Sequence, residues 1–259
     1  MQNPYTLEVC ADSVESAIAA EAGGATRREL CGGLVIGGLT PSLALFHEVR
    51  RRCRLPVRVL LRPRYGDFLY TDSEFAVLLE EVSCFRAAGA DGVVIGCLTA
   101  DGALDLPRME ALIRRADGLP VTLHRAFDMA ADPMRALADA RALGVSTILT
   151  SGQQNDCLAG RALLRRLLEA AGDGPEILVG GGVNAGVIRA LAGELGARCF
   201  HMSGKAVLPS ALRWRTPAVS MGAAGLDEYA VWRTDESAVR EAAAALRADF
   251  CANSQKIHK

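Results

Sequence analysis

The chain has 259 residues, half of them hydrophobic and 23% charged, with a formal net charge of −1, a composition typical of a globular protein with one large or two small domains. Lysine and arginine are spread along the chain, which excludes an extended basic surface for nucleic acid or an anionic membrane. No apolar run approaches the roughly 18 residues of a membrane span, and the polar start lacks the features of a secretory signal, so we expect a cytoplasmic protein.

Short β-rich apolar runs recur along the chain, and helix-compatible segments lie between them. The runs are Leu7–Cys10, Arg28–Leu30, Val57–Leu61, Val93–Ile95, Val121–Leu123, Thr147–Thr150, Ile177–Val179 and Cys199–His201. The intervening segments 13–23, 72–89, 132–144 and 184–196 open on Ser, Asp or Asn and close on Gly, which are common residues at helix starts and ends. Strand and helix therefore alternate throughout.

The residues that lead into the strands alternate between two types. Gly precedes the second, fourth, sixth and eighth strands, at Gly24, Gly89, Gly144 and Gly196. Pro precedes the third, fifth and seventh strands, at Pro56, Pro120 and Pro175. Gly accepts the left-handed conformation that ends many helices, whereas Pro stops a helix and suits the first residue of a strand. The pattern indicates a unit of two strands and two helices repeated four times.

Eight parallel strands in about 250 residues predict an α/β fold with a single (β/α)₈ TIM barrel. We expect one domain over residues 1–259, with frayed ends at 1–6 and 252–259 and an irregular extra segment near the C-terminus. A doubly wound open sheet is the alternative. Residues 10–16, after the first strand, lack the Gly-rich nucleotide fingerprint that such a sheet often carries there.

The loops that follow the strands build the active face of this barrel, and those after the seventh and eighth strands are its usual phosphate site. The residues there are Gly181, Gly182, Ser203, Gly204 and Lys205. Small residues let backbone N–H groups approach an anion, and a helix N-terminus adds its dipole. The sequence thus predicts an anion-binding site, although the glycines could merely permit a tight turn.

Ionisable residues follow the third and fifth strands. The candidate catalytic residues are His124, Arg125, Asp128, Glu8, Arg62 and Arg64. Asp128 could orient His124 or Arg125, while Arg62 and Arg64 share a face of the chain near Asp67. His124 and Glu8 suit general acid or base catalysis, because imidazole titrates near neutrality and burial raises the pKa of a carboxyl. Ion pairs that hold long loops are the alternative, and no motif names a reaction.

A Glu-x-Cys tripeptide occurs twice, at residues 8–10 and 29–31. Adjacent barrel strands end close together, so we expect Cys10 and Cys31 to be neighbours, with Glu8 and Glu29 one layer below them. Two thiolates are a soft ligand pair for Cu(I) and are also what a disulfide requires. The simpler interpretation is that both cysteines are small buried hydrophobic residues. No organic cofactor is indicated.

At these residues the chain resembles the CutC family of copper homeostasis proteins. The matching segments, in family order, are LEVCADSVESA, RELCGGLVIGGLTPS, RPRYGDFLYTDSE, ADGVVIGCLTADGALD, VTLHRAFDM, ILTSGQ, GGGV, HMSGK and RWRTPAVSMG. The resemblance implies a cytoplasmic (β/α)₈ barrel that is dimeric or larger. It also implies Cu(I) binding by the cysteines that close the first two strands, here Cys10 and Cys31. Tyr65 departs from the usual glycine, and its side chain could narrow the barrel mouth.

Three hypotheses follow from these observations. The first is a cytosolic copper homeostasis protein that binds Cu(I) through the cysteine pair, forms a homodimer or larger homo-oligomer, and contacts neither nucleic acid nor membrane. The second is a TIM-barrel enzyme of unknown reaction that acts on a small anionic, phosphate-bearing substrate. The third is an interaction protein whose barrel mouth is closed. Whether the chain is an enzyme is left open by the sequence.

Overall fold

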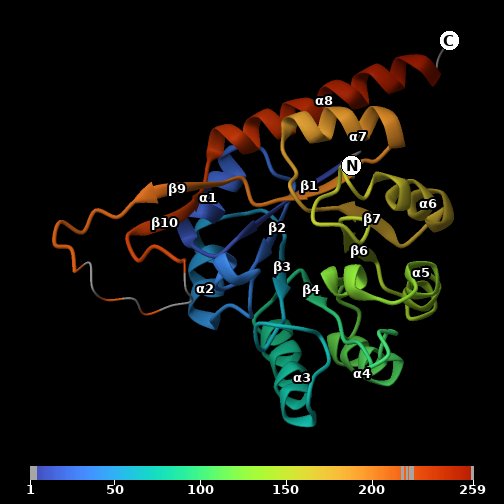
Figure 1. The fold of residues 1–259 in the computed structure, drawn as a ribbon, viewed down its shortest axis with the longest axis horizontal. Helices are drawn as coiled ribbons and strands as arrows, with labels where there is room; N and C mark the ends of the chain where they lie inside the picture. The colour runs from blue at the N-terminus through green and yellow to red at the C-terminus, as the bar shows by residue number, and fades with distance from the viewer. Residues whose placement is uncertain (1–4, 217–218, 220, 222–224, 258–259) are drawn as a thin grey trace.

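The computed structural model describes residues 5–216, 219, 221 and 225–257. Eight parallel strands close into a barrel in the order β1 to β8, with helices around the outside (Figure 1). The strands are β1 (Thr6–Ala11), β2 (Arg27–Leu30), β3 (Val57–Leu60), β4 (Gly92–Ile95), β5 (Val121–Leu123), β6 (Thr147–Thr150), β7 (Glu176–Val179) and β8 (Cys199–Met202). The predicted (β/α)₈ barrel is confirmed, and each predicted strand end is within one residue of the observed one.

Several helices begin at a side-chain acceptor. The helices are α1 (Val14–Ala22), α2 (Leu43–Arg52), α3 (Asp72–Ala87), α4 (Leu106–Ala116), α5 (Pro133–Ala142), α6 (Arg161–Ala171), α7 (Ala185–Leu195) and α8 (Glu236–Ile257), with 3₁₀ turns η1 (Leu34–Ile36) and η2 (Arg125–Met129). Ser13, Asp132 and Asn184 each accept a hydrogen bond from a backbone N–H of the first turn, as expected of N-cap residues, whereas α6 begins after Gly160 without such an acceptor. Within the described parts of the chain, none of the helices combines the length and apolar character needed to cross a bilayer.

The glycines that enter the even-numbered strands adopt the predicted left-handed conformation. The φ angle is +93° at Gly24 and +85° at Gly89. At the first of these ends, the N–H of Ala25 donates to the carbonyl of Ala20 and the N–H of Gly24 to that of Glu21, the bonding pattern of a Schellman motif. The same pair of bonds recurs before β4 and β6, so the repeated Gly junction in the sequence is a repeated helix end.

Alternation along the strands separates two regions of the core. Leu7 and Val9 belong to the large cluster that packs the barrel against its helices. Side chains alternate along a strand, so Glu8 and Cys10 face the barrel interior. Branched apolar residues usually fill that interior. Here its lower layers hold buried polar side chains, and these are Glu8, Glu29, Arg58, Thr122 and Thr147.

The strands are staggered, and the stagger corrects one expectation from the sequence. Cys10 lies opposite Glu29 in the register of β1 and β2, and Cys31 lies one inward-facing step farther toward the barrel mouth. The two thiols therefore do not share a layer above Glu8 and Glu29. The expectation was wrong because closing eight strands into a barrel requires neighbouring strands to shift along one another, which the spacing of the Glu-x-Cys repeats does not reveal.

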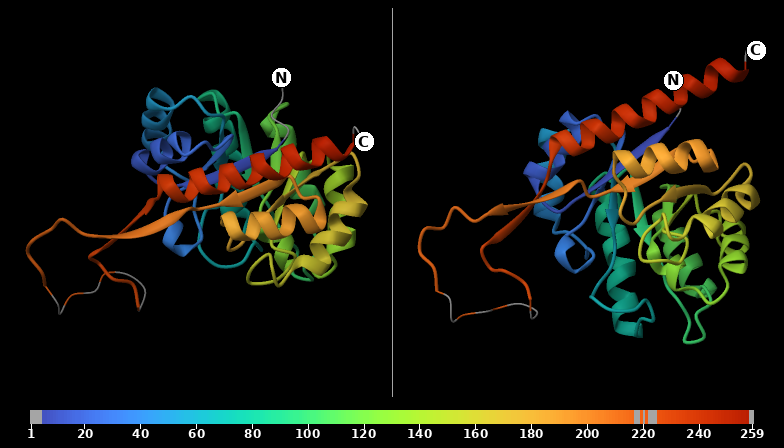
Figure 2. Two further views of the ribbon diagram at one scale, coloured as in Figure 1. Left: turned by 90° about the horizontal axis from the view of Figure 1, so that it is seen from above. Right: turned by 45° about the horizontal axis from the view of Figure 1, so that its top comes forward.

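The extra C-terminal segment contains a β-hairpin and a long helix. Strands β9 (Lys205–Pro209) and β10 (Ala230–Thr234) pair antiparallel, and this hairpin projects from the side of the barrel (Figures 1 and 2). Helix α8 packs against α7 and α1. Of the ends expected to fray, Thr6 starts β1 and residues 252–257 continue α8, whereas residues 1–4 and 258–259 lie outside the described part of the chain.

Candidate functional site

A cavity of about 390 Å³ opens at the C-terminal ends of the barrel strands. Its polar lining consists of Cys10, Glu29, Cys31, Arg62, His124, Arg125, Asp128 and His201. Its apolar lining consists of Leu34, Ile36, Leu60, Phe68, Met129 and Leu149. Pockets of this size, with an apolar wall and a few convergent polar groups, are typical of small-ligand sites.

A buried ionic network forms the floor beneath this cavity. The Glu8 carboxylate is fully buried, and it accepts one hydrogen bond from Nε of Arg27 at 2.5 Å and another from Nδ1 of His201 at 2.9 Å. Burial opposes ionisation, but the charges of Arg27 and His201 outweigh it and lower the pKa of Glu8 to about 2. Arg58 lies in the same interior and donates to Thr122 and Thr147.

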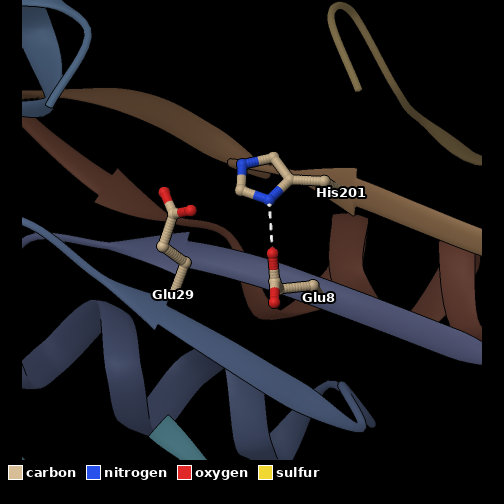
Figure 3. Close-up of side chains that lie close together, drawn as sticks. All are labelled: Glu8, Glu29 and His201. Carbon is tan, nitrogen blue, oxygen red and sulfur yellow. Dashed lines mark hydrogen bonds and ion pairs between the residues drawn. The ribbon is translucent and has the colours of Figure 1, made fainter. Parts of the chain in front are cut away.

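His201 joins Glu8 to the cavity. Figure 3 shows Glu8 hydrogen-bonded to one ring nitrogen of His201. Glu29 is directed toward the ring from β2, the strand beside that of Glu8. Donor atoms of these three residues lie within 4.8 Å of one another. Burial works against a charged ring, yet the neighbouring Cys10, Glu29 and Glu8 raise the pKa of His201 well above its ordinary range. A protonated ring does not coordinate a metal, so while His201 keeps its proton it forms an ion pair with Glu8.

Glu29 is the group of this network that titrates near neutrality. Its carboxyl is buried, and one of its oxygens, Oε2, has no hydrogen-bond partner in the described ranges of the chain. Burial, reinforced by the negative charge of Glu8 and opposed by His201, raises the pKa of Glu29 to about 7. Glu29 can therefore accept or release a proton at neutral pH, which is the property that acid-base catalysis or proton-coupled binding requires.

Glu29 makes stability depend on pH. Between the ordinary pKa of 4.5 and the folded value of about 7, the folded chain holds this proton more tightly than the unfolded chain, so the free energy of unfolding falls as pH rises through that window. We expect Glu29→Gln to remove up to about 3 kcal/mol of this fall. Urea unfolding at several pH values checks it, with Glu48→Gln, at a half-buried position on the surface of α2, as control. An unchanged pH slope in Glu29→Gln would contradict the assignment.

Cys10 and Cys31 contact the same cavity from neighbouring strands. Both are buried thiols: Sγ of Cys10 donates to the Met202 carbonyl and Sγ of Cys31 to the Ala11 carbonyl, each at 3.6 Å. Burial, reinforced by Cys10 and Glu29, raises the pKa of Cys31 well above its ordinary range. A thiolate at Cys31 therefore needs a cation beside it.

His124 lies in the wall of the cavity, where β5 ends. The N–H of Ala126 donates to its Nδ1 at 3.1 Å, so the proton of the neutral ring is on Nε2. Burial, with a contribution from the Arg62 charge, lowers the pKa of His124 to about 3. The ring fits only because residue 96 is glycine, since a Cβ there would lie 2.6 Å from Cε1 of His124.

Asp128 orients Arg125, and within the described part of the chain it forms no hydrogen bond with His124. Oδ2 of Asp128 accepts from Nε of Arg125 at 2.7 Å, and the same carboxylate accepts from the hydroxyls of Thr150 and Ser151. Arg125 also donates to Ser151. Of the two partners that the sequence left open for Asp128, the structure therefore selects Arg125.

The two arginines after β3 point in different directions. Arg62 is buried in the cavity wall. Arg64 donates to Asp67 and to Glu74, at 2.9 and 2.6 Å, so it ties the loop after β3 to the start of α3 and does not line the cavity. Tyr65 is 69% exposed and is not among the lining residues, so its side chain does not narrow the mouth.

The residues of the predicted anion site lie outside the cavity lining. They are Gly181, Gly182, Ser203, Gly204 and Lys205. Lys205 begins β9, and its ammonium lies 3.7 Å from the centroid of the Trp232 ring. Gly204 packs against Val239 and Met202. Phosphate binding at these two loops stays a prediction. The hypothesis of an enzyme that acts on a phosphate-bearing substrate stays a prediction as well.

Sequence reasoning missed His201 and Arg27 as parts of the site. His201 lies two residues from Cys199 on β8, and its partner Glu8 is 193 positions away along the chain. The sequence offered one indication of His201, a polar residue within an otherwise apolar predicted strand. Its meaning depends on β8 closing against β1, where Glu8 and His201 are register partners.

Comparison with known proteins places the chain among close relatives. The model of the CutC family matches residues 5–206. A family protein CutC of Chromobacterium violaceum is 46% identical over 234 residues, which is 90% of this chain and 95% of the relative. A family protein CutC of Salmonella typhimurium is 43% identical over 236 residues, covering 91% of this chain and 94% of the relative.

Solved structures agree with the fold. A Streptococcus agalactiae protein, provisionally described as copper homeostasis protein CutC, is 30% identical with a TM-score of 0.73, and the match covers 77% of this chain and 98% of that one. Thiamine phosphate pyrophosphorylase from Pyrococcus furiosus has a TM-score of 0.54 at 16% identity, covering 95% of this chain and 97% of that one. At that identity the second likeness concerns the barrel fold alone.

Proposed function

The chain belongs to the CutC family, and we propose that it is a copper homeostasis protein that binds Cu(I) through the thiolates of Cys10 and Cys31. The observation that carries this proposal is that both sulfurs are buried in the wall of one cavity at the barrel mouth. Thiolates are the protein ligands that Cu(I) prefers. A ligand cavity between them gives the ion an entry path, which a metal site needs.

The surroundings of the thiols favour a bound cation. The pKa of Cys31 is raised by burial and by nearby negative charge, so a thiolate there is stable only when a positive ion neutralises it. Copper binding must then displace thiol protons, and Glu29, whose pKa is about 7, is a buried group that can release another. The donor set therefore fits Cu(I) as cargo, with affinity that rises with pH.

A cytoplasmic location is part of the proposal. All eight cysteines are unpaired thiols, the state that a reducing compartment maintains, and Cu(I) binding by Cys10 and Cys31 requires them reduced. The Streptococcus agalactiae relative is provisionally described as a copper homeostasis protein, which supports the same assignment here.

An anaerobic Cu(I) titration tests the function. Wild-type protein should bind one Cu(I) tightly, and Cys10→Ser and Cys31→Ser should each weaken that binding. Unchanged affinity in both variants would reject the cysteine-pair site.

We also propose that the chain forms a homodimer or larger homo-oligomer through the β9–β10 hairpin. A two-stranded hairpin is marginally stable alone in water, and this one projects from the barrel (Figure 2). Large apolar side chains on it and in its connecting segment are exposed, including Val207 at 59% and Trp214 at 76%. Such a surface is typical of an interface.

Breaking that surface should change the mass in solution. We expect wild type to sediment as a dimer or larger species and the double variant Val207→Asp, Trp214→Ser to sediment as a monomer, because a buried charge opposes association. Analytical ultracentrifugation measures this. Val77→Asp on α3, where Val77 is 47% exposed, is the matched control. A monomeric wild type, or a double variant of unchanged mass, would contradict the proposal.

A further inference from the structure

Arg62 is a buried cation without a carboxylate partner among the described residues. Its side chain lies in the cavity wall, where the residue is only 9% exposed. Nη1 donates to the Gly38 carbonyl at 3.2 Å and Nη2 to the Gly66 carbonyl at 2.6 Å, while Nε is buried with no partner. Burying a charge is costly unless an opposite charge compensates it. Arg62 therefore lacks both an anion and one hydrogen-bond acceptor.

His124 presents a second donor without an acceptor in the same wall. Its Nδ1 accepts from Ala126, so Nε2 carries the proton. That Nε2 is buried and has no partner among the residues that the structure describes, and His124 is 3% exposed. A buried donor without an acceptor is destabilising, so two of them in one cavity wall point to an acceptor that belongs there.

Phe68 lies against both donors. Its ring centroid is 4.6 Å from that of His124 and 5.0 Å from Cζ of Arg62. Phe68 belongs to the loop between β3 and α3 and itself lines the cavity. The two side chains that carry unpartnered N–H groups thus both lie against one aromatic ring.

We propose that the cavity binds a small monocarboxylate with an apolar body, whose carboxylate oxygens accept from Nε of Arg62 and Nε2 of His124. The other cations of the cavity lining each have a carboxylate partner, Asp128 for Arg125 and Glu8 for His201. Among the described residues of the lining, Arg62 is thus the cation without such a partner, and it matches a single negative charge on the ligand. Leu60, Met129 and Leu149 in the remaining wall receive the apolar part.

The carboxylate site is independent of copper. Its hydrogen-bond donors are Arg62 and His124 and not the thiols of Cys10 and Cys31, so the metal-free protein should bind the carboxylate. Failure of the copper proposal would show as unchanged Cu(I) affinity in the cysteine variants. Failure of the carboxylate proposal would show only in the measurements below.

Ligand-detected NMR on the metal-free full chain tests the site. The probes are acetate, isovalerate and 4-fluorobenzoate, each compared with its carboxamide, which has the same shape and no charge. We expect at least one acid to bind and its amide to bind at least about tenfold more weakly, because charge-assisted hydrogen bonds are lost. Arg62→Met and His124→Phe should each weaken binding of the acid by about tenfold.

Arg64→Met is the matched control, because Arg64 lies on the same loop but outside the cavity lining. It should bind the acid like wild type. Circular dichroism establishes that each variant is folded, and His124→Phe decides the matter if Arg62→Met does not fold. The proposal is overturned if no acid of the panel binds, if the amides bind equally well, or if the folded Arg62 or His124 variant binds like wild type.

Discussion

Replacing Glu8 with glutamine is expected to lower the free energy of unfolding by about 3–5 kcal/mol, the cost of breaking a buried ion pair by removing one partner. Glu8 is fully buried and accepts from both Arg27 and His201. Without its charge, those two largely enclosed side chains, 13% and 12% exposed, remain as cations without their shared carboxylate. A loss of this size is a large fraction of the stability of a typical domain.

Urea unfolding near neutral pH measures the effect of Glu8→Gln. Glu48→Gln is the control, because Glu48 forms exposed ion pairs with Arg51 and Arg52 and such pairs contribute about 0–1 kcal/mol. The contribution of Glu8 should be complete above its ordinary pKa of 4.5 and should disappear as pH falls toward the folded pKa of about 2. A loss equal to that of the control would show that the network does not hold the barrel floor.

The second large effect is expected on copper affinity. Cys10→Ser and Cys31→Ser should each weaken Cu(I) binding by more than about 100-fold, because even substitutions outside the ligand set cost about 10–100-fold in metal sites. Serine keeps the size of the side chain and removes the soft donor. The stagger of β1 and β2 places the two thiols at successive levels of the barrel interior, and neither alone offers a ligand pair.

Competition against a chromophoric Cu(I) chelator under anaerobic conditions measures this affinity. The background should lack Cys84 and Cys251, which are half-buried and exposed thiols that could bind copper adventitiously. Cys53→Ser, a buried thiol outside the cavity lining, is the matched control and should bind like wild type. Single variants of Cys10 and Cys31 within about threefold of wild type would remove the basis for the site.

Local chemistry made the fold predictable. The Gly that ends a helix before an even-numbered strand and the Pro that starts an odd-numbered one act within a few residues of chain, so their alternation could be read without tertiary information. The β9–β10 hairpin was not predicted as strands. Its residues show no apolar alternation against a core, since β9 is largely exposed.

The site was predictable in part, because strand ends of a barrel converge. Cys10, Cys31, Arg62 and His124 could be assigned to the mouth from position alone, and all four line the cavity. The layers could not be predicted, because strand stagger is a property of the closed sheet. The orientation of Arg64 depends on Glu74 of α3, a tertiary contact.

The pKa shifts of the two buried carboxyls were also not predictable from the sequence. Glu8 was expected to have a raised pKa because it is buried, and its pKa is lowered instead, to about 2, by Arg27 and His201. The group with the raised pKa is Glu29, at about 7. Burial raises the pKa of both carboxyls, and the charged neighbours of Glu8 reverse that shift while those of Glu29 do not.

X-ray absorption spectroscopy of the Cu(I)-loaded protein tests the proposed copper site most directly, because it identifies the atoms bound to copper. We expect two sulfur neighbours in wild type, one in Cys10→Ser or Cys31→Ser, and copper not retained in the double variant. A copper environment made of nitrogen or oxygen, or one that is unchanged in the double variant, would contradict binding by this cysteine pair.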